Sequence, residues 1–200
     1  MSIKEKVVQV EVGEKLPKRG SMLVRGFMIL ILFAIGWKAT GYIPNVSKIV
    51  LVGAPHTSNG EGILTVLISL AMGIRVSWMT KHTLFKRPFG FIFRWLGGVP
   101  VDRTGPHGAV AQMVQLINEH EQIVLAIMPE GTRDQVREWK KGFYYIAQGS
   151  DAPIVPALFD YAKKEVHFAG IFETSGDYEI DLPLIKAYFE DVVPRHPERA

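Results

Sequence analysis

The 200-residue sequence contains no cysteine. Thiol nucleophiles, thiolate metal sites and disulfide bonds are therefore excluded. A membrane-spanning run is also missing, because the uninterrupted apolar stretch at residues 27–36 is about half of the ~20 residues that such a helix needs. Lys4, Glu5 and Lys6 precede no apolar core, so the N-terminal residues do not have the pattern of a signal peptide. We expect a protein of the cytoplasm or of the cytoplasmic face of a membrane.

Several common functional motifs are absent as well. Glycines surround His56, but Gly60 is followed by Glu61 instead of Lys and Ser or Thr, so this loop is not a P-loop. No Gly-x-Gly-x-x-Gly follows a predicted strand, and no Gly-x-Ser-x-Gly elbow occurs. The other histidines lack the spacing of metal ligands, and we expect no metal site. The net charge of +3 suits an anionic partner, but without a nucleic-acid motif we expect no nucleic acid to bind.

Alternating strand and helix patterns predict the fold class. A hydrophobic fraction of 48% and a charged fraction of 22% are typical of one globular domain with a sizeable core. The alternation predicts a single α/β domain with a mostly parallel mixed sheet flanked by helices. The predicted strands are 48–52, 75–79, 97–103, 122–128, 152–158 (broken by its prolines) and 161–168. The predicted helices are 60–72, 109–120, 140–148 and 183–192.

The chain divides into four predicted parts. Residues 1–21 mix charge with glycine and proline, which indicates a poorly ordered leader with a short strand at 7–12. Residues 22–40 carry an apolar helix, residues 41–193 form the α/β domain, and residues 194–200 are expected to be a loose tail.

Two segments have a composition that suits a membrane surface. Residues 22–37 are apolar except for Arg25 and end in a tryptophan, so an interfacial helix and a buried core helix are both consistent with the pattern. Residues 81–96 are aromatic and cationic with no acid among them. They are consistent with contact to anionic lipid head groups, and equally with a helix whose aromatics are buried while its cations reach solvent.

The stretch around His56 carries the clearest chemical signal. It lies between a predicted strand and a predicted helix, and Glu61 follows shortly. A neutral imidazole can accept a proton from a hydroxyl, and a carboxylate can orient that imidazole. Because residues five apart on a helix do not share a face, the pair meets only if His56 lies on the turn. The same residues fit a capping box with Ser58 at the N-cap and Glu61 at N3, so this stretch alone leaves both interpretations open.

Other polar residues follow predicted strands in the same way. Arg103 follows the strand at 97–103, and residues 130–133 follow the strand at 122–128. Sites in parallel α/β sheets lie at the carboxyl ends of strands. We therefore expect these residues to converge with His56 at one edge of the sheet.

Taken together, these motifs resemble those of the glycerolipid (lysophospholipid) acyltransferase family, and in particular its 1-acyl-glycerol-3-phosphate acyltransferases. The first family motif is a His followed after four residues by an Asp, matched by His56 with Glu61 in place of the Asp. The remaining motifs are a Gly-rich turn ending in Arg at 98–103, Pro-Glu-Gly-Thr-Arg at 129–133 and a Val-Pro strand at 154–157. All four occur in the family's order, and the third is specific.

The resemblance implies a reaction. His56 would be the general base for the acceptor hydroxyl, with Glu61 as its acidic partner. The hydroxyl oxygen would attack the thioester of acyl-CoA or acyl-carrier protein directly, with no acyl-enzyme and no cofactor besides this acyl donor. The acceptor would be a lysophospholipid, foremost 1-acyl-glycerol-3-phosphate, which gives phosphatidic acid. The enzyme would work as a peripheral or monotopic protein on a phospholipid membrane surface.

The resemblance also implies acceptor-binding residues, because arginine pairs well with phosphate oxygens. These are Arg103, Glu130, Gly131, Thr132 and Arg133. By charge alone, further contacts to phosphate are expected from Lys81, Lys140 and Lys141.

Glu61 departs from the family pattern. Its extra methylene extends the side chain by roughly 1.5 Å. Gly60, where the family often has a bulky residue, is expected to leave room for it. Three alternatives stay open: an acyltransferase for another lysolipid, a lipid-binding protein with weakened catalysis, and a lipid hydrolase that uses Ser58 or Thr57 as nucleophile.

Overall fold

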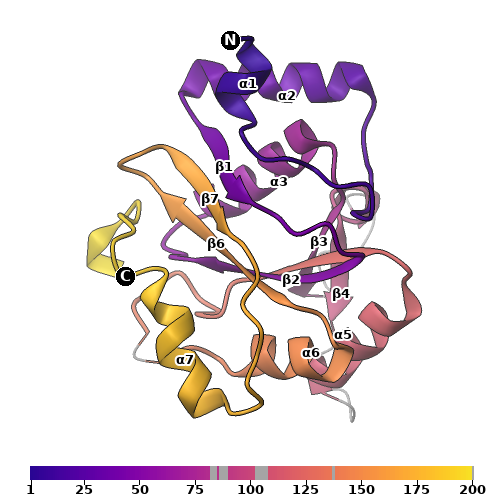
Figure 1. Cartoon of the computed structure of the whole chain (residues 1–200), viewed down its shortest axis with the longest axis vertical. Helices are drawn as coiled ribbons and strands as arrows, with labels where there is room; N and C mark the ends of the chain where they lie inside the picture. The colour runs from indigo at the N-terminus through magenta and orange to yellow at the C-terminus, as the bar shows by residue number, and fades with distance from the viewer. Residues whose placement is uncertain (82–84, 86–89, 102–107, 137, 200) are drawn as a thin grey trace.

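The computed structural model describes residues 1–81, 85, 90–101, 108–136 and 138–199 (Figure 1). Its centre is a seven-stranded sheet in the order β1-β7-β6-β2-β5-β3-β4. All neighbouring strands are parallel except the antiparallel pair β6 and β7. The strands are β1 Lys38–Tyr42, β2 Lys48–Ala54, β3 Val76–Lys81, β4 Gly98–Val101, β5 Ile123–Ile127, β6 Ile154–Asp160 and β7 Glu165–Ala169. The predicted single α/β domain with a mostly parallel mixed sheet is confirmed.

Helices cover both faces of the sheet, as Figure 1 shows. The helices are α1 Ile3–Val7, α2 Met22–Ile35, α3 Gly60–Met72, α4 Gly90–Trp95, α5 Gly108–Glu119, α6 Gly142–Ser150 and α7 Tyr178–Ala187. A short 3₁₀ turn, η2 Pro197–Arg199, lies near the C-terminus. Helices α1 to α3 lie on one face, and α5 to α7 lie on the other.

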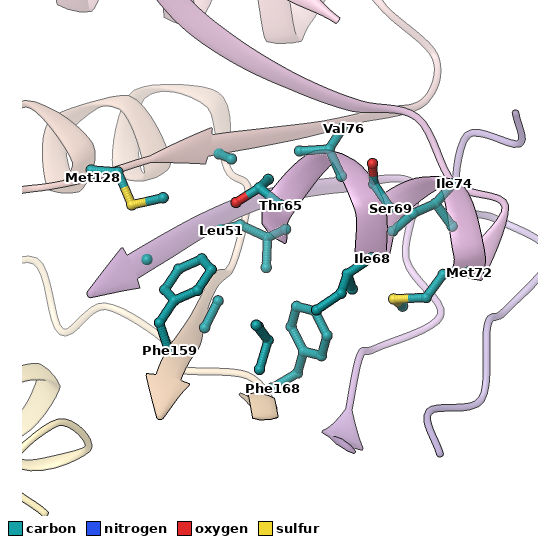
Figure 2. A pocket seen from close by; sticks show the side chains of 14 residues that line it. Leu51, Thr65, Ile68, Ser69, Met72, Ile74, Val76, Met128, Phe159 and Phe168 are labelled. Atoms are coloured by element: carbon teal, nitrogen blue, oxygen red, sulfur yellow. The ribbon is translucent and has the colours of Figure 1, made fainter. Parts of the chain in front are cut away.

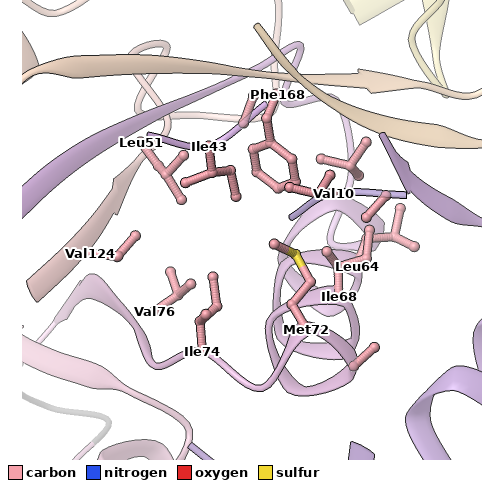
Figure 3. Packing of buried hydrophobic residues seen from close by; sticks show 14 of the residues in the cluster. Val10, Ile43, Leu51, Leu64, Ile68, Met72, Ile74, Val76, Val124 and Phe168 are labelled. Carbon is pink, nitrogen blue, oxygen red and sulfur yellow. The ribbon is translucent and has the colours of Figure 1, made fainter. Parts of the chain in front are cut away.

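Strand periodicity explains the two cores. Successive side chains of a strand point to opposite faces. In β2, Ile49 and Leu51 therefore join the core between the sheet and α1 to α3, whereas Val50 and Val52 join the core between the sheet and α5 to α7. Figure 3 shows the first core, in which Leu64, Ile68 and Met72 of α3 pack toward Leu51 and Phe168 of the sheet. β2 is buried along nearly its whole length, which is why its sequence is continuously apolar.

The N-terminal segment is ordered and packed, contrary to the expectation of a loose leader. Ser2 and Glu5 form a capping box at the start of α1. Val7, Val10 and Leu16 are buried in the core with α2 and α3. Residues 7–12 form no strand beyond a single bridge at Val8. Its few apolar residues are spaced irregularly and pack against distant helices, so no local pattern indicates that the segment is ordered.

The apolar helix α2 is shorter than expected. It ends at Ile35, because Gly36 adopts the left-handed conformation with φ 78°. Edge strand β1 then begins at Lys38, within the range predicted for the apolar helix segment. Leu32 is fully buried, whereas Met22, Leu23 and Phe27 are exposed by 88%, 85% and 60%. No described helix is long and apolar enough to cross a bilayer.

The C-terminal third also differs in detail. β6 runs unbroken through Pro156, which is paired with Val52 of β2. β7 begins only at Glu165, because residues 161–164 form a turn. α7 begins five residues before Pro183, since the Asp177 carboxylate caps its first turn by accepting two backbone N–H groups. The predicted loose tail contacts the domain through His196, whose N–H donates to the Thr57 hydroxyl at 3.2 Å.

Candidate active site

Two loops meet at the carboxyl ends of neighbouring central strands. β2 and β5 are parallel partners, with Val52 opposite Ile127, so the loops that follow them leave the same edge of the sheet. The N–H of His56 donates to the Glu130 carboxylate at 2.9 Å. The guanidinium of Arg133 donates to the Asn59 side chain. The convergence expected of residues 130–133 with His56 is therefore present, and hydrogen bonds join the two motifs.

Within the first loop, His56 and Glu61 face one another. Nδ1 of His56 lies 3.5 Å from Oε2 of Glu61, with the imidazole 19% exposed and the carboxylate fully buried. This separation is at the outer limit of a hydrogen bond, so the contact is mainly electrostatic. Because Nδ1 is buried against Glu61, Nε2 is the ring nitrogen left for a substrate.

Glu61 combines the two roles that the sequence left open. Its Oε2 accepts the backbone N–H of Ser58 at 2.8 Å, which is one half of a capping box. The Ser58 hydroxyl donates to the same carboxylate at 2.9 Å and accepts the N–H of Gly60. The helix begins at Gly60 as predicted, but its N-cap is Asn59, one residue after the Ser58 of the capping-box interpretation, and the Asn59 side chain makes no capping bond. One carboxylate thus fixes the turn and orients the imidazole.

The pKa values of the two buried glutamates, Glu61 and Glu130, are shifted in opposite directions. Burial by itself raises the pKa of Glu61, but polar interactions with His56, the backbone, Ser58 and Tyr161 outweigh it, so the pKa lies below the ordinary value. Burial raises the pKa of Glu130, and the charge of Glu61 adds to this rise, while the N–H and charge of His56 oppose it. Glu61 is therefore the carboxylate that is held ionised beside the imidazole.

Of the other residues predicted to bind the acceptor, Gly131, Thr132 and Lys140 lie at the site, whereas Lys141 is directed away from it. The end of the Lys140 side chain lies over Gly131, whose φ of 67° disfavours any residue with a side chain at that position. The Thr132 hydroxyl lies beside Asp134 at 3.5 Å. Lys141 is turned elsewhere, because its ammonium pairs with Glu179 at 2.6 Å.

Lys81 and Arg103 are the two other cations predicted to contact phosphate. Lys81 is the last residue of β3, so its backbone lies at the strand's carboxyl end. Arg103 lies outside the described residues.

Two cavities open onto His56. The larger has a volume of about 720 Å³ and runs between α3, β3 and α4, with Arg133 and Thr132 at its polar part and Trp78 and Phe93 in its apolar wall. The smaller, of about 440 Å³, lies toward α5 and α6 and is lined by Lys140. A third, apolar cavity of about 30 Å³ lies inside the core, where Figure 2 shows Thr65 and Met128 on its wall; both also line the larger cavity.

The structure corrects the expectation about Gly60 and places two further residues, Tyr161 and Arg195, beside it. A Cβ at Gly60 would lie 2.6 Å from the Tyr161 hydroxyl and 2.9 Å from both Arg195 Nη1 and Ser58 Oγ. The room beside Gly60 is therefore filled. Tyr161 and Arg195 carried no sequence signal, because only folding brings the end of β6 and the C-terminal segment to this turn.

A model of the family described as Acyltransferase matches residues 38–160 of the chain. The chain belongs to the acyltransferase family. The matched range contains both loops of the site and six of the seven strands of the sheet, and β7 lies beyond it. In the described part of this family member, no three His, Asp or Glu side chains are grouped as metal ligands would be.

Two curated relatives bear the name 1-acyl-sn-glycerol-3-phosphate acyltransferase. The protein from Streptococcus pneumoniae is 26% identical over 141 residues, which cover 68% of this chain and 52% of the relative. The protein from Bacillus subtilis is 32% identical over 99 residues, which cover 46% of this chain and 49% of the relative. The chain thus spans about half the length of the curated relatives it matches.

The fold is shared with a solved structure. The crystal structure of the 1-acyl-sn-glycerophosphate (LPA) acyltransferase PlsC from Thermotoga maritima superposes with a TM-score of 0.59 at 17% identity. The superposition covers 83% of this chain and 75% of that chain. The resemblance inferred from the four motifs is confirmed at the level of family and fold.

The raised pKa of Glu130 predicts a pH-dependent effect on stability. A carboxyl whose folded pKa exceeds its unfolded value favours the folded state at low pH and loses that contribution as pH rises through the folded pKa. Glutamine at this position cannot ionise. The melting temperature of Glu130→Gln relative to the unmodified protein should therefore increase from pH 4 to pH 7. The exposed Glu173→Gln is the control, and an equal trend in both variants would show that Glu130 is not the source.

Proposed function

We propose that this chain is an O-acyltransferase that moves a fatty acyl group from a thioester, acyl-CoA or acyl-carrier protein, to the free hydroxyl of 1-acyl-glycerol-3-phosphate. The observation that carries the proposal is a histidine, oriented by a buried ionised glutamate, at the point where two cavities meet. A direct transfer needs acceptor and donor at the base together, and two cavities that share His56 suit that requirement. The names of the curated relatives support the same acceptor.

The proposed reaction uses one base. Nε2 of His56 accepts the proton of the acceptor hydroxyl while the oxygen attacks the thioester carbonyl, forming the new ester bond. The carbon–sulfur bond breaks, and the thiolate leaves with the proton that His56 returns. Glu61 stabilises the transient imidazolium through Nδ1, at the 3.5 Å contact.

The hydroxyl groups beside His56 argue against the hydrolase alternative. Ser58 has its proton directed at Glu61 and its oxygen accepting the N–H of Gly60. Thr57 is fully buried, with its oxygen accepting the N–H of His196. Both hydroxyls are occupied in holding the turn, so neither is directed at a substrate. The contact between Glu61 and His56 likewise argues against a merely lipid-binding protein.

The acceptor is proposed to bind in the larger cavity. Its apolar wall suits an acyl chain, and Arg133 at its polar part suits a phosphate. Arg103 is proposed as a second phosphate contact from its sequence motif. Lys140, which lines the smaller cavity, suits an anionic group of the acyl donor as well as the acceptor phosphate.

Membrane association is proposed to be peripheral. The exposed side chains of α2 include Leu23 and Phe27, and those of α4 include Phe91 and Trp95, which are exposed by 70% and 58%. The guanidinium of Arg19, just before α2, lies 4.6 Å from the Trp95 ring and so joins the two segments. Cations beside exposed aromatic and aliphatic side chains suit an anionic bilayer surface, as on a cytoplasmic leaflet.

The proposed base and its partner predict a set of kinetic effects. His56→Ala should lower kcat by about 10²- to 10⁴-fold, the usual contribution of general-base catalysis. Glu61→Gln keeps the shape of the side chain and loses its charge, so kcat should fall by about 10-fold or more with a small change in melting temperature. Acyl transfer from acyl-CoA to 1-acyl-glycerol-3-phosphate is the assay.

The same assay separates the two roles of Glu61. If Glu61→Gln turns over like the unmodified protein, the glutamate only caps the helix. Glu61→Asp then tests whether the turn has specialised on the longer side chain, which a loss of turnover would show. Ser58→Ala provides the test against hydrolase chemistry, since a nucleophile cannot be removed without loss of all turnover.

The proposed phosphate contact predicts a selective effect on the acceptor. Arg133→Ala should lower kcat/KM for the acceptor by roughly 10- to 100-fold, because a hydrogen bond to a charged group contributes about 1.5–3 kcal/mol. The KM of the acyl donor should change by less than about 3-fold. Arg199→Ala, on the C-terminal 3₁₀ turn, is the matched control. Equal effects on donor and acceptor would place the phosphate elsewhere.

The proposed membrane face predicts a site-specific loss of vesicle binding. Leu23→Ser should weaken sedimentation with anionic phospholipid vesicles by roughly 10-fold, since burying a leucine contributes about 1.5–3 kcal/mol. Ile180→Ser is the control, because Ile180 is 59% exposed but lies on α7, across the sheet from α2. Equal losses in both variants, or equal binding of the unmodified protein to neutral and anionic vesicles, would contradict the proposed face.

A further inference from the structure

Tyr161 stands at the same edge of the sheet as the proposed catalytic pair. It directly follows β6, which pairs in parallel with β2 so that Leu158 lies opposite Ala54. The chain therefore leaves β2 and β6 at the same edge of the sheet. The Tyr161 hydroxyl oxygen is buried and has no hydrogen bond of good geometry in the described structure. A buried hydroxyl without a partner is unfavourable, so the groups within its reach are informative.

The ring of Tyr161 is held in place from two sides. It makes an edge contact with Trp37, with ring centroids 4.9 Å apart and planes at 82°. Its backbone N–H donates to the Val193 carbonyl at 2.9 Å. These contacts fix where the hydroxyl lies, which is over Gly60 and close to Ser58. An aromatic ring packed in this way presents its hydroxyl with little loss of conformational entropy.

Charged and polar groups surround this point. Glu61 contacts His56 and Ser58 in its own turn, and its charge acts on Glu130 and on Tyr161. The guanidinium of Arg195, in the C-terminal segment, lies beside Gly60 and the Tyr161 hydroxyl. Burial raises the pKa of Tyr161, the neighbouring Ser58 hydroxyl opposes the rise, and the charge of Glu61 adds to it. The phenol therefore keeps its proton at neutral pH and can donate it to the carboxylate.

We propose that Tyr161 is a positioning residue of the site, whose hydroxyl donates to the Glu61 carboxylate and holds it against Nδ1 of His56. The absence of a side chain at Gly60 is what admits the hydroxyl to this place. The pairing explains how a glutamate serves where the family motif has the shorter aspartate. The inference rests on the proposed function for its kinetic consequences, but the contact itself does not depend on catalysis.

The kinetic test is Tyr161→Phe, which keeps the ring and its contact with Trp37. We expect kcat for acyl transfer to fall by about 5- to 30-fold, with the KM of the acceptor within 2-fold and the melting temperature nearly unchanged. In a Glu61→Gln background, the same change should lower kcat by less than 2-fold, because the carboxylate it serves is already gone. Tyr42→Phe is the matched control, since Tyr42 is 58% exposed on edge strand β1.

A titration of Glu61 tests the contact without any activity. With ¹³Cδ-labelled glutamate, the Glu61 resonance is assigned as the one missing in Glu61→Gln. Removing a donor to the ionised carboxylate should raise the pKa of Glu61 by about half a unit to one unit in Tyr161→Phe and leave it unchanged in Tyr42→Phe.

The outcomes distinguish the two proposals. If the unmodified protein transfers no acyl group, the proposed function fails, while a raised Glu61 pKa in Tyr161→Phe still supports the positioning contact. If the unmodified protein is active, an equal fold loss with and without Glu61 would make Tyr161 a merely structural residue. An unchanged Glu61 pKa would overturn the inference in either case.

Discussion

The buried carboxylate of Glu61 is the interaction on which the rest of the site depends. It is fully buried, so its charge has lost most of its hydration and persists only because donors replace the water. Ser58 supplies a backbone N–H and a hydroxyl, and His56 supplies Nδ1. The same bonds shape the turn between β2 and α3. The conformation that presents the histidine and the charge that orients it therefore have one origin.

The parallel sheet brings the other components to this carboxylate. β2 is the central strand, with β5 on one side and β6 on the other. All three run in the same direction, so the loops after them gather at one edge. The loop after β5 contributes Glu130, whose carboxylate accepts the N–H of His56, and Tyr161 directly follows β6. Two cavities share His56 at this edge, which suits a base that acts on two substrates.

Much of this arrangement could be predicted from local pattern. The β-branched run at 48–52 and the helical pattern at 60–72 correspond closely to β2 and α3. The two continuous motifs of the site, from His56 to Glu61 and from Pro129 to Arg133, each lie within a few residues of a strand end. Elements whose partners are remote were harder to predict. β1 is a short edge strand containing Gly41, and it is a strand because β7 lies beside it.

The sequence by itself determined the fold class, the family and the residues of the two motifs, because periodicity, turn chemistry and a continuous motif are local properties of a chain. Only the tertiary structure decided that Glu61 both caps α3 and faces His56, that Lys141 is paired with Glu179, and that the leader is packed. It alone placed the hydroxyl of Tyr161 and the guanidinium of Arg195 beside Gly60. Some of these residues are more than a hundred positions apart in the sequence. Strand pairing and packing bring them together in the fold, and no local pattern encodes either.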